Sequence, residues 1–150
     1  MAGPVDTGEE ESGEEALPPE PEVRQGKFVF PSGAMYDGEY MVVDGVMVRH
    51  GNGKHVDGKE TYVGQWQHDA MDGEGEIVFG SDATYRGSFV GNRFDGYGSY
   101  SWDDGATYEG SWRENKMHGR GCYTDSNKSR WEGEFFNGMY DTGRSMIALR

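Results

Sequence analysis

The chain has 150 residues, 25 glycines, an aromatic share of 13% and a formal net charge of −13 at pH 7. Leucine and isoleucine occur only twice each, and every glycine inside a helix costs about 1 kcal/mol, so the composition excludes a helix bundle and favours β-strands. The acidity disfavours nucleic acid and anionic lipid as partners, because no basic patch in the sequence offsets it.

Residues 1–24 are predicted to be a disordered acidic tail rich in Pro and Glu. Residues 1–22 contain eight carboxylates and no Lys or Arg. Such a stretch buries too little apolar surface to offset the entropy lost on ordering. We interpret it as a solubilising segment, with docking or phosphorylation as the alternative. It lacks the basic and apolar parts of a signal peptide, and the single cysteine, Cys122, fits a reducing compartment, so we expect a cytoplasmic protein.

From Gly26 onward the sequence repeats, and the units that start at 62, 85, 108 and 131 are evenly spaced. The predicted repeat domain covers 25–143. It contains a half repeat at 26–35, repeats that start at 36, 62, 85 and 108, a partial repeat from 131, and a short tail at 144–150. The repeat at 36 is longer than the others because of a four-residue insertion within 41–50, which we place at a hairpin tip.

Each repeat predicts a β-hairpin. Alternate strand residues share a face, so Tyr108, Gly110 and Trp112 lie on one side of the sheet. The segment 114–116 reverses the chain, and its asparagine tolerates the left-handed backbone of a tight turn. The return strand places Met117 and Tyr123 on the same face as Tyr108. Because every turn is short, the predicted fold is all-β: an elongated, twisted antiparallel meander in a single-layer sheet.

Glycines and aromatic residues are in phase in every repeat. A large ring can lie flat on a neighbouring strand only where that strand has no side chain, and such pairing recovers some of the stability that glycine costs a strand. We therefore predict that the rings cover cross-strand glycines. One hairpin is marginal alone, so stability has to come from stacking of the repeats.

The pattern Tyr-x-Gly-x-Trp followed by Met-His-Gly-x-Gly, best seen over 108–123, resembles the MORN repeat. The resemblance covers about 26–143. The histidine of the His-Gly step is present as His50 and His118 but is replaced by Asp72 and Asp95. The resemblance implies a scaffold: members are often parts of cilia and flagella, including radial spokes, or bind partner helices. In larger proteins the module accompanies enzymes or membrane junctions.

No residue pattern indicates catalysis, so we predict that the protein is not an enzyme and uses no cofactor. The Gly-x-Gly steps could suggest phosphate cradles, but they recur in phase with the strands and none opens a helix. The four histidines lack metal-ligand spacing with Cys122, and no metal site is expected. Cys122 itself has no nucleophile context.

The aromatic face is the predicted functional surface, because a single-layer sheet cannot cover both of its faces. We expect a groove that docks a helical or extended segment of another protein. Its predicted lining is Tyr62, Trp66, Met71, Tyr85, Phe89, Phe94, Tyr108, Trp112, Met117 and Tyr123. The function we expect is a scaffold or adaptor in a ciliary or flagellar axoneme. The alternative is a membrane-apposed adaptor that binds phosphoinositides or membrane-associated proteins, and self-association through open sheet ends is left open.

Overall fold

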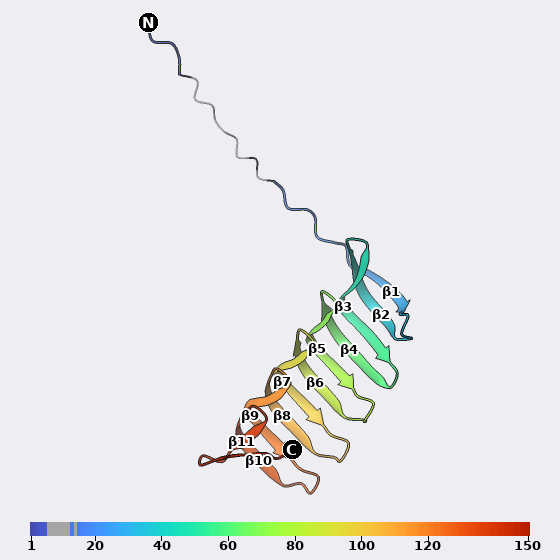
Figure 1. Ribbon diagram of the computed structural model, residues 1–150, viewed down its shortest axis with the longest axis vertical. Helices are drawn as coiled ribbons and strands as arrows, with labels where there is room; N and C mark the ends of the chain where they lie inside the picture. The colour runs from blue at the N-terminus through green and yellow to red at the C-terminus, as the bar shows by residue number, and fades with distance from the viewer. Residues whose placement is uncertain (6–12, 14) are drawn as a thin grey trace.

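The structure is a computed structural model that describes residues 1–5, 13 and 15–150. The described residues form one sheet of 12 strands, each antiparallel to its neighbours in chain order (Figure 1). The strands are β1 (Arg24–Val29), β2 (Met35–Val43), β3 (Val46–Asp57), β4 (Glu60–Gln67), β5 (Ala70–Val78), β6 (Thr84–Val90), β7 (Arg93–Ser101), β8 (Thr107–Arg113), β9 (Lys116–Thr124), β10 (Arg130–Phe136), β11 (Met139–Asp141) and β12 (Met146–Ile147). The predicted all-β hairpin meander is confirmed.

The register places equivalent residues of β1 to β10 in rows that cross the sheet. One row, called here the aromatic row, consists of Phe28, Tyr36, His55, Tyr62, Ile77, Tyr85, Tyr100, Tyr108, Tyr123 and Trp131. The row beside it, the glycine row, consists of Gly26, Gly38, Gly53, Gly64, Gly75, Gly87, Gly98, Gly110, Gly121 and Gly133. Each strand from β1 to β10 thus contributes one residue to each row.

The hairpin turns have the backbone that their sequence predicts. Both central residues of the turn after β8, Glu114 and Asn115, have positive φ, of 47° and 70°. The turns at 68–69 and 91–92 repeat this conformation, whose twist matches that of the flanking strands. The longer first hairpin turns at 44–45, so the four-residue insertion extends the two strands that flank its tip.

Consecutive hairpin tips are hydrogen-bonded to one another. The backbone N–H of Asn115 donates to the carbonyl oxygen of Phe94 at 3.0 Å, and the Asn115 side chain accepts from the Phe94 N–H at 2.9 Å. At the His-Gly position, Asp95 accepts the N–H of Glu114 and His118 accepts the N–H of Asn137, each at 3.3 Å. Aspartate can therefore replace histidine there, because both supply an acceptor for the next turn.

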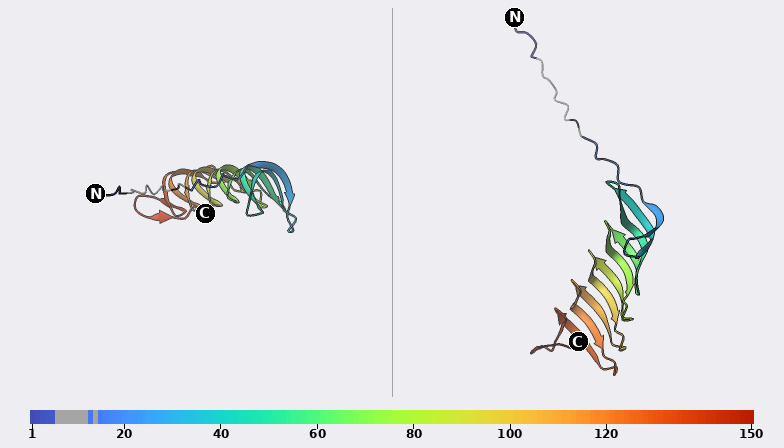
Figure 2. Two further views of the ribbon diagram at one scale, coloured as in Figure 1. Left: turned by 90° about the horizontal axis from the view of Figure 1, so that it is seen from above. Right: turned by 45° about the vertical axis from the view of Figure 1, so that its right-hand side comes forward.

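The strands bow, so the sheet has a concave and a convex face (Figure 2, left). The sheet begins at Arg24, one residue before the expected domain boundary, and residues 15–23 lead away from it (Figure 1). The predicted disorder of 1–24 falls partly on residues 6–12 and 14, which lie outside the described residues. Residues 146–147, expected in a tail, add the short strand β12. In the described part of the chain, no helix has the length and apolarity needed to cross a membrane.

Candidate functional site

Four tyrosines of the aromatic row, Tyr36, Tyr62, Tyr85 and Tyr108, lie over glycines of the glycine row, as predicted. A Cβ atom added at Gly121 would lie 2.2 Å from the Tyr108 hydroxyl oxygen and 2.5 Å from the ring carbon that bears it. The equivalent clash occurs at Gly75 with Tyr62 and at Gly98 with Tyr85. Only glycine leaves room for these rings, so the second glycine of each Gly-x-Gly step has a packing role.

The first glycine of each Gly-x-Gly step has a different role, in an irregularity of the hairpin. Between β8 and β9 the pairing steps by two residues on β8, from Gly110 to Trp112, but by four on β9, from Gly121 to Met117. Gly119 lies within this step with φ of 86°, a left-handed conformation that favours glycine. Backbone geometry and ring packing thus explain the glycines of these steps, in line with the structural role that their spacing predicts.

The tyrosine hydroxyls bind the backbone at the same irregularity. Tyr108 donates to the carbonyl oxygen of Ser111 at 2.9 Å, and Tyr85 donates to that of Ser88 at 2.8 Å. Burial raises the pKa of both phenols, and it raises the pKa of Tyr36 to about 12. These hydroxyls therefore stay protonated as hydrogen-bond donors at neutral pH.

The rings also pack on one another in a continuous edge-to-face series. Trp112 contacts Tyr108 of its own strand with ring centroids 5.1 Å apart, and Tyr85 of the preceding repeat at 5.5 Å, with interplanar angles of 85° and 88°. Phe89 makes the same two contacts one repeat earlier, with Tyr85 and Tyr62. Such pairs add about 0.5–1.5 kcal/mol each beyond the area they bury. The core of this one-layer protein is thus a row of rings.

Most of the predicted groove residues belong to this core. Eight of the ten have buried side chains: Tyr62, Trp66, Tyr85, Phe89, Tyr108, Trp112, Met117 and Tyr123. Met117, expected to line the groove, is 6% exposed. Met71 and Phe94 are half-buried, and Phe94 stacks on Tyr85 with ring centroids 3.8 Å apart. The rings therefore cover one another, and binding by these ten residues stays a prediction.

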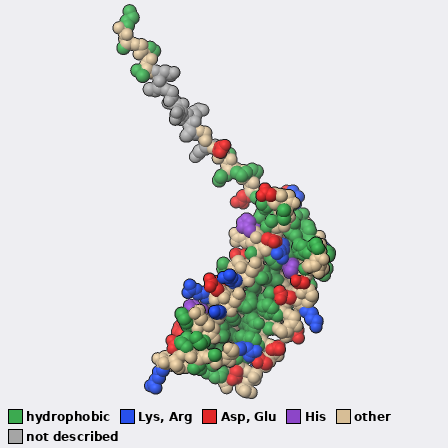
Figure 3. Space-filling view, viewed as in Figure 1, with side chains coloured by type: hydrophobic (Ala, Val, Ile, Leu, Met, Phe, Trp, Pro, Cys, Tyr) green, Lys and Arg blue, Asp and Glu red, His purple; other side chains and the backbone are tan. Residues whose placement is uncertain are grey.

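A second set of rings, which the sequence analysis did not select, remains half-exposed on the same face. This set, called here the open rings, consists of Phe79, Tyr100, Trp102 and Trp131. Trp102 lies 4.6 Å from Tyr100 and 5.7 Å from Tyr123, centroid to centroid. Phe79 and Trp102 occupy the same position in consecutive repeats, and that equivalence was a signal that could have identified them. Figure 3 shows hydrophobic side chains in a band along this face, with charged side chains beside it.

The last residues of the sequence return to the open rings. Leu149 packs against the ring core, and the guanidinium carbon of Arg150 lies 4.5 Å from the Trp102 ring centroid. Arg150 Nη1 lies 2.7 Å from Asp104 Oδ2. The left view of Figure 2 shows the C-terminus on the concave side of the sheet.

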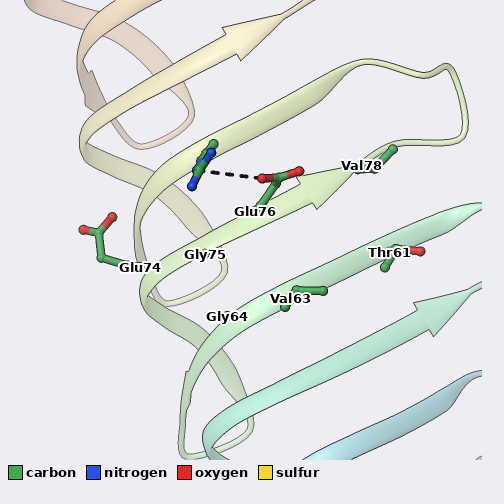
Figure 4. A pocket seen from close by; sticks show the side chains of 8 residues that line it. Thr61, Val63, Gly64, Glu74, Gly75, Glu76 and Val78 are labelled. Atoms are coloured by element: carbon green, nitrogen blue, oxygen red, sulfur yellow. Dashed lines mark ion pairs between the residues drawn. The ribbon is translucent and has the colours of Figure 1, made fainter.

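The convex face carries charged side chains together with exposed apolar ones such as Val63 and Tyr97. A hollow of about 510 Å³ on this face is lined by Val63, Glu76 and Arg86 among others, and the Arg86–Glu76 ion pair spans 3.8 Å (Figure 4). Among the described residues, no cluster of three His, Cys or carboxylate side chains could hold a metal ion. Cys122 lies on the strand side opposite the aromatic row, and the guanidinium of Arg130 donates to its sulfur at 3.3 Å.

The comparisons agree with this architecture. The family model of the MORN repeat matches three consecutive segments, 62–84, 85–107 and 108–130. A comparison with curated proteins found no match to the chain. MORN repeats are a non-enzymatic repeat family that takes part in protein–protein or membrane interactions. Each matched segment runs from one aromatic-row tyrosine to the start of the next repeat, so residues 62–130 of this chain are three MORN repeats in tandem.

Proposed function

We propose that the protein is a non-catalytic scaffold or adaptor that docks a helical or extended segment of a partner protein on its concave face. One observation carries the proposal: no second layer packs on this face in the described chain, and the open rings stay half-exposed along it. Half-buried aromatic side chains supply large, rigid contact area, and aromatic residues are enriched at protein interfaces.

A cytoplasmic assembly such as a ciliary or flagellar axoneme, for example a radial spoke, is the setting we propose. The support for it is the resemblance to family members found there. The elongated sheet suits such a role, because repeats that contact only their neighbours make an extended surface along which a partner segment can lie.

The alternative partner is a membrane surface that carries phosphoinositides or membrane-associated proteins. Residues 23–150 contain 19 acidic and 14 basic side chains, a balance of −5, so the sheet repels anionic lipid overall. Protein is therefore the favoured partner. Co-sedimentation with phosphoinositide vesicles at moderate salt distinguishes the two, because strong, salt-sensitive binding would reverse this ranking.

Site-specific photo-crosslinking tests the proposed face. A photoreactive phenylalanine analogue replaces Phe79 on the concave face in one variant, and Tyr97, which is 61% exposed on the convex face, in a matched control. We expect a protein cross-link in lysate of ciliated cells from position 79 and none from position 97. Cross-links from 97 alone would place the interface on the convex face and contradict the proposal.

A further inference from the structure

Residues 146–150 return to the open rings and contact them as a separate bound peptide could. Strand β12 pairs with β11 through two residue pairs, Tyr140 with Ile147 and Asp141 with Met146. Beyond it, Leu149 packs against the ring core and Arg150 reaches Asp104, a residue 46 positions earlier in the sequence. The contact thus joins the end of the sequence to the turn after β7.

The Arg150 site recognises two properties of a guanidinium group. The flat face of the guanidinium lies over the Trp102 ring, with the guanidinium carbon 4.5 Å from the ring centroid. Asp104 accepts a hydrogen bond from a guanidinium N–H at 2.7 Å. The ammonium group of lysine is a compact charge that cannot present a planar face and a hydrogen-bonding edge together. The neighbouring ring core offers apolar surface to the residue that precedes the arginine.

The same combination occurs at the other end of the sheet. Arg49 lies over Trp66, with its guanidinium carbon 4.2 Å from the ring centroid, and its Nε lies 2.7 Å from Asp69 Oδ1. Hydrogen bonds from Arg49 hold the Asp69 carboxyl pKa below its usual value, although burial alone would raise it. The concave face thus pairs an indole ring and a carboxylate with arginine at two separate places.

One repeat before the Arg150 site, the ring is present but the carboxylate is missing. Phe79 is the equivalent of Trp102 in that repeat, and Ser81 is the equivalent of Asp104. That position has a serine hydroxyl where the Arg150 site has the Asp104 carboxylate. The pair of ring and carboxylate at 102 and 104 therefore distinguishes this turn from the equivalent turn one repeat earlier.

We propose that Trp102 and Asp104 bind an extended segment of a partner protein in which an aliphatic residue is followed directly by arginine, and that residues 146–150 occupy this site until the partner displaces them. The proposal rests on the proposed function and names the chemistry of its partner. The occupying segment is easily displaced: β12 has two residues, and the ion pair is partly open to solvent, with Arg150 30% and Asp104 47% exposed.

The test measures binding of a blocked, fluorescein-labelled peptide with the sequence of 144–150 to the full chain by fluorescence anisotropy. Wild type competes with its own segment at an effective concentration on the order of millimolar, so it binds the peptide weakly. We expect the release variant Leu149→Ser/Arg150→Gln to bind at least about tenfold more tightly. Arg150→Lys retains the charge and most of the segment, so its affinity for the peptide should lie between those of wild type and the release variant.

Matched charge changes locate the binding. In the release variant, Asp104→Asn should abolish the gain, whereas Asp103→Asn next to it should leave the gain intact. A control peptide with glutamine in place of its last residue should bind at least about tenfold more weakly than the parent peptide. Equal affinity of wild type and release variant, or equal effects of the two Asp→Asn changes, would overturn the proposal. Circular dichroism confirms that each variant retains the sheet.

The two proposals fail separately. A partner that cross-links at position 79 and binds equally well to Asp104→Asn would leave the docking face in place and overturn the arginine site. Peptide binding that depends on Asp104, with no protein cross-linked at position 79, would support the arginine site and remove the support for the wider docking face.

Discussion

The hydroxyl of Tyr108 donates a hydrogen bond to the carbonyl oxygen of Ser111, three residues later on the same strand. Ser111 lies where the pairing between β8 and β9 changes register. The same ring covers Gly121 on β9. One side chain therefore holds the backbone irregularity and packs the cross-strand glycine, which explains why tyrosine begins the motif and why glycine faces it.

Tyr108→Phe should destabilise the protein while leaving the ring in place. The substitution removes only the hydroxyl, and the Ser111 carbonyl loses its buried donor, which costs about 1–3 kcal/mol. Urea denaturation monitored by circular dichroism measures the loss. Tyr97→Phe is the control: Tyr97 is exposed and its hydroxyl binds Glu109 at the surface, so little change in the free energy of unfolding is expected. Equal losses in the two variants would contradict this role of Tyr108.

Gly110→Val should destabilise the fold, although valine is the better strand residue. A Cβ atom at Gly110 would lie 2.4 Å from the Cα of Gly121 and 2.6 Å from the carbonyl oxygen of Arg120. Neither backbone atom can move without separating β8 from β9, so we expect a loss of at least about 2 kcal/mol. Thermal melting followed by circular dichroism measures it, and a neutral or stabilising result would refute the close approach of β8 and β9 at the glycine row.

Gly80→Ala is the matched control for that experiment. The nearest heavy atom to an added Cβ at Gly80 is Lys59 Cβ, 3.7 Å away, and Gly80 does not have a positive φ. Alanine there should be neutral or should stabilise by up to about 1 kcal/mol, because it restricts the unfolded chain. A large loss at Gly80 would show that glycine substitutions harm this sheet irrespective of packing.

The repeat period and the glycine spacing predict the hairpins, turns and ring-on-glycine contacts, because these features are local and recur in every unit. Burial of Met117 was not predictable in this way, since it depends on how the bowed strands bring neighbouring rings together. The contact between Arg150 and Asp104 occurs once and spans 46 residues, so no periodic signal reports it. The repeat pattern therefore does not predict the curvature of the strands or contacts between residues far apart in the sequence.

Glu114→Asn should stabilise the protein. Glu114 has φ of 47°, a left-handed conformation that costs an ordinary side chain about 1–2 kcal/mol and asparagine less. Asn137 occupies the same place in the last hairpin, with the same φ. We expect a gain of about 0.5–1 kcal/mol in the free energy of unfolding, measured in urea. Glu114→Gln removes the same charge without the backbone preference and should give no such gain; an equal gain would assign the effect to charge.

His55→Tyr should reduce the loss of stability on acidification. Burial, helped by the Arg49 charge, lowers the pKa of His55 from its ordinary value of 6.5. The folded protein then binds this proton more weakly than the unfolded chain, so His55 lowers stability as the pH falls from about 6.5 toward its folded pKa and adds no further loss below it. Tyr100 and Tyr123 occupy the same place in the aromatic row, so tyrosine should fit.

The measurement compares unfolding in urea at about pH 7.5 and about pH 5 for wild type and His55→Tyr, because the carboxylates titrate equally in both. The variant should lose less stability between the two conditions. A histidine that is stabilised by an acidic partner would make the fold more stable on acidification. His55 has the opposite effect on the free energy of unfolding. If the variant loses more stability than wild type, His55 gains favourable charge contacts in the fold, and burial is not the dominant influence on its ring.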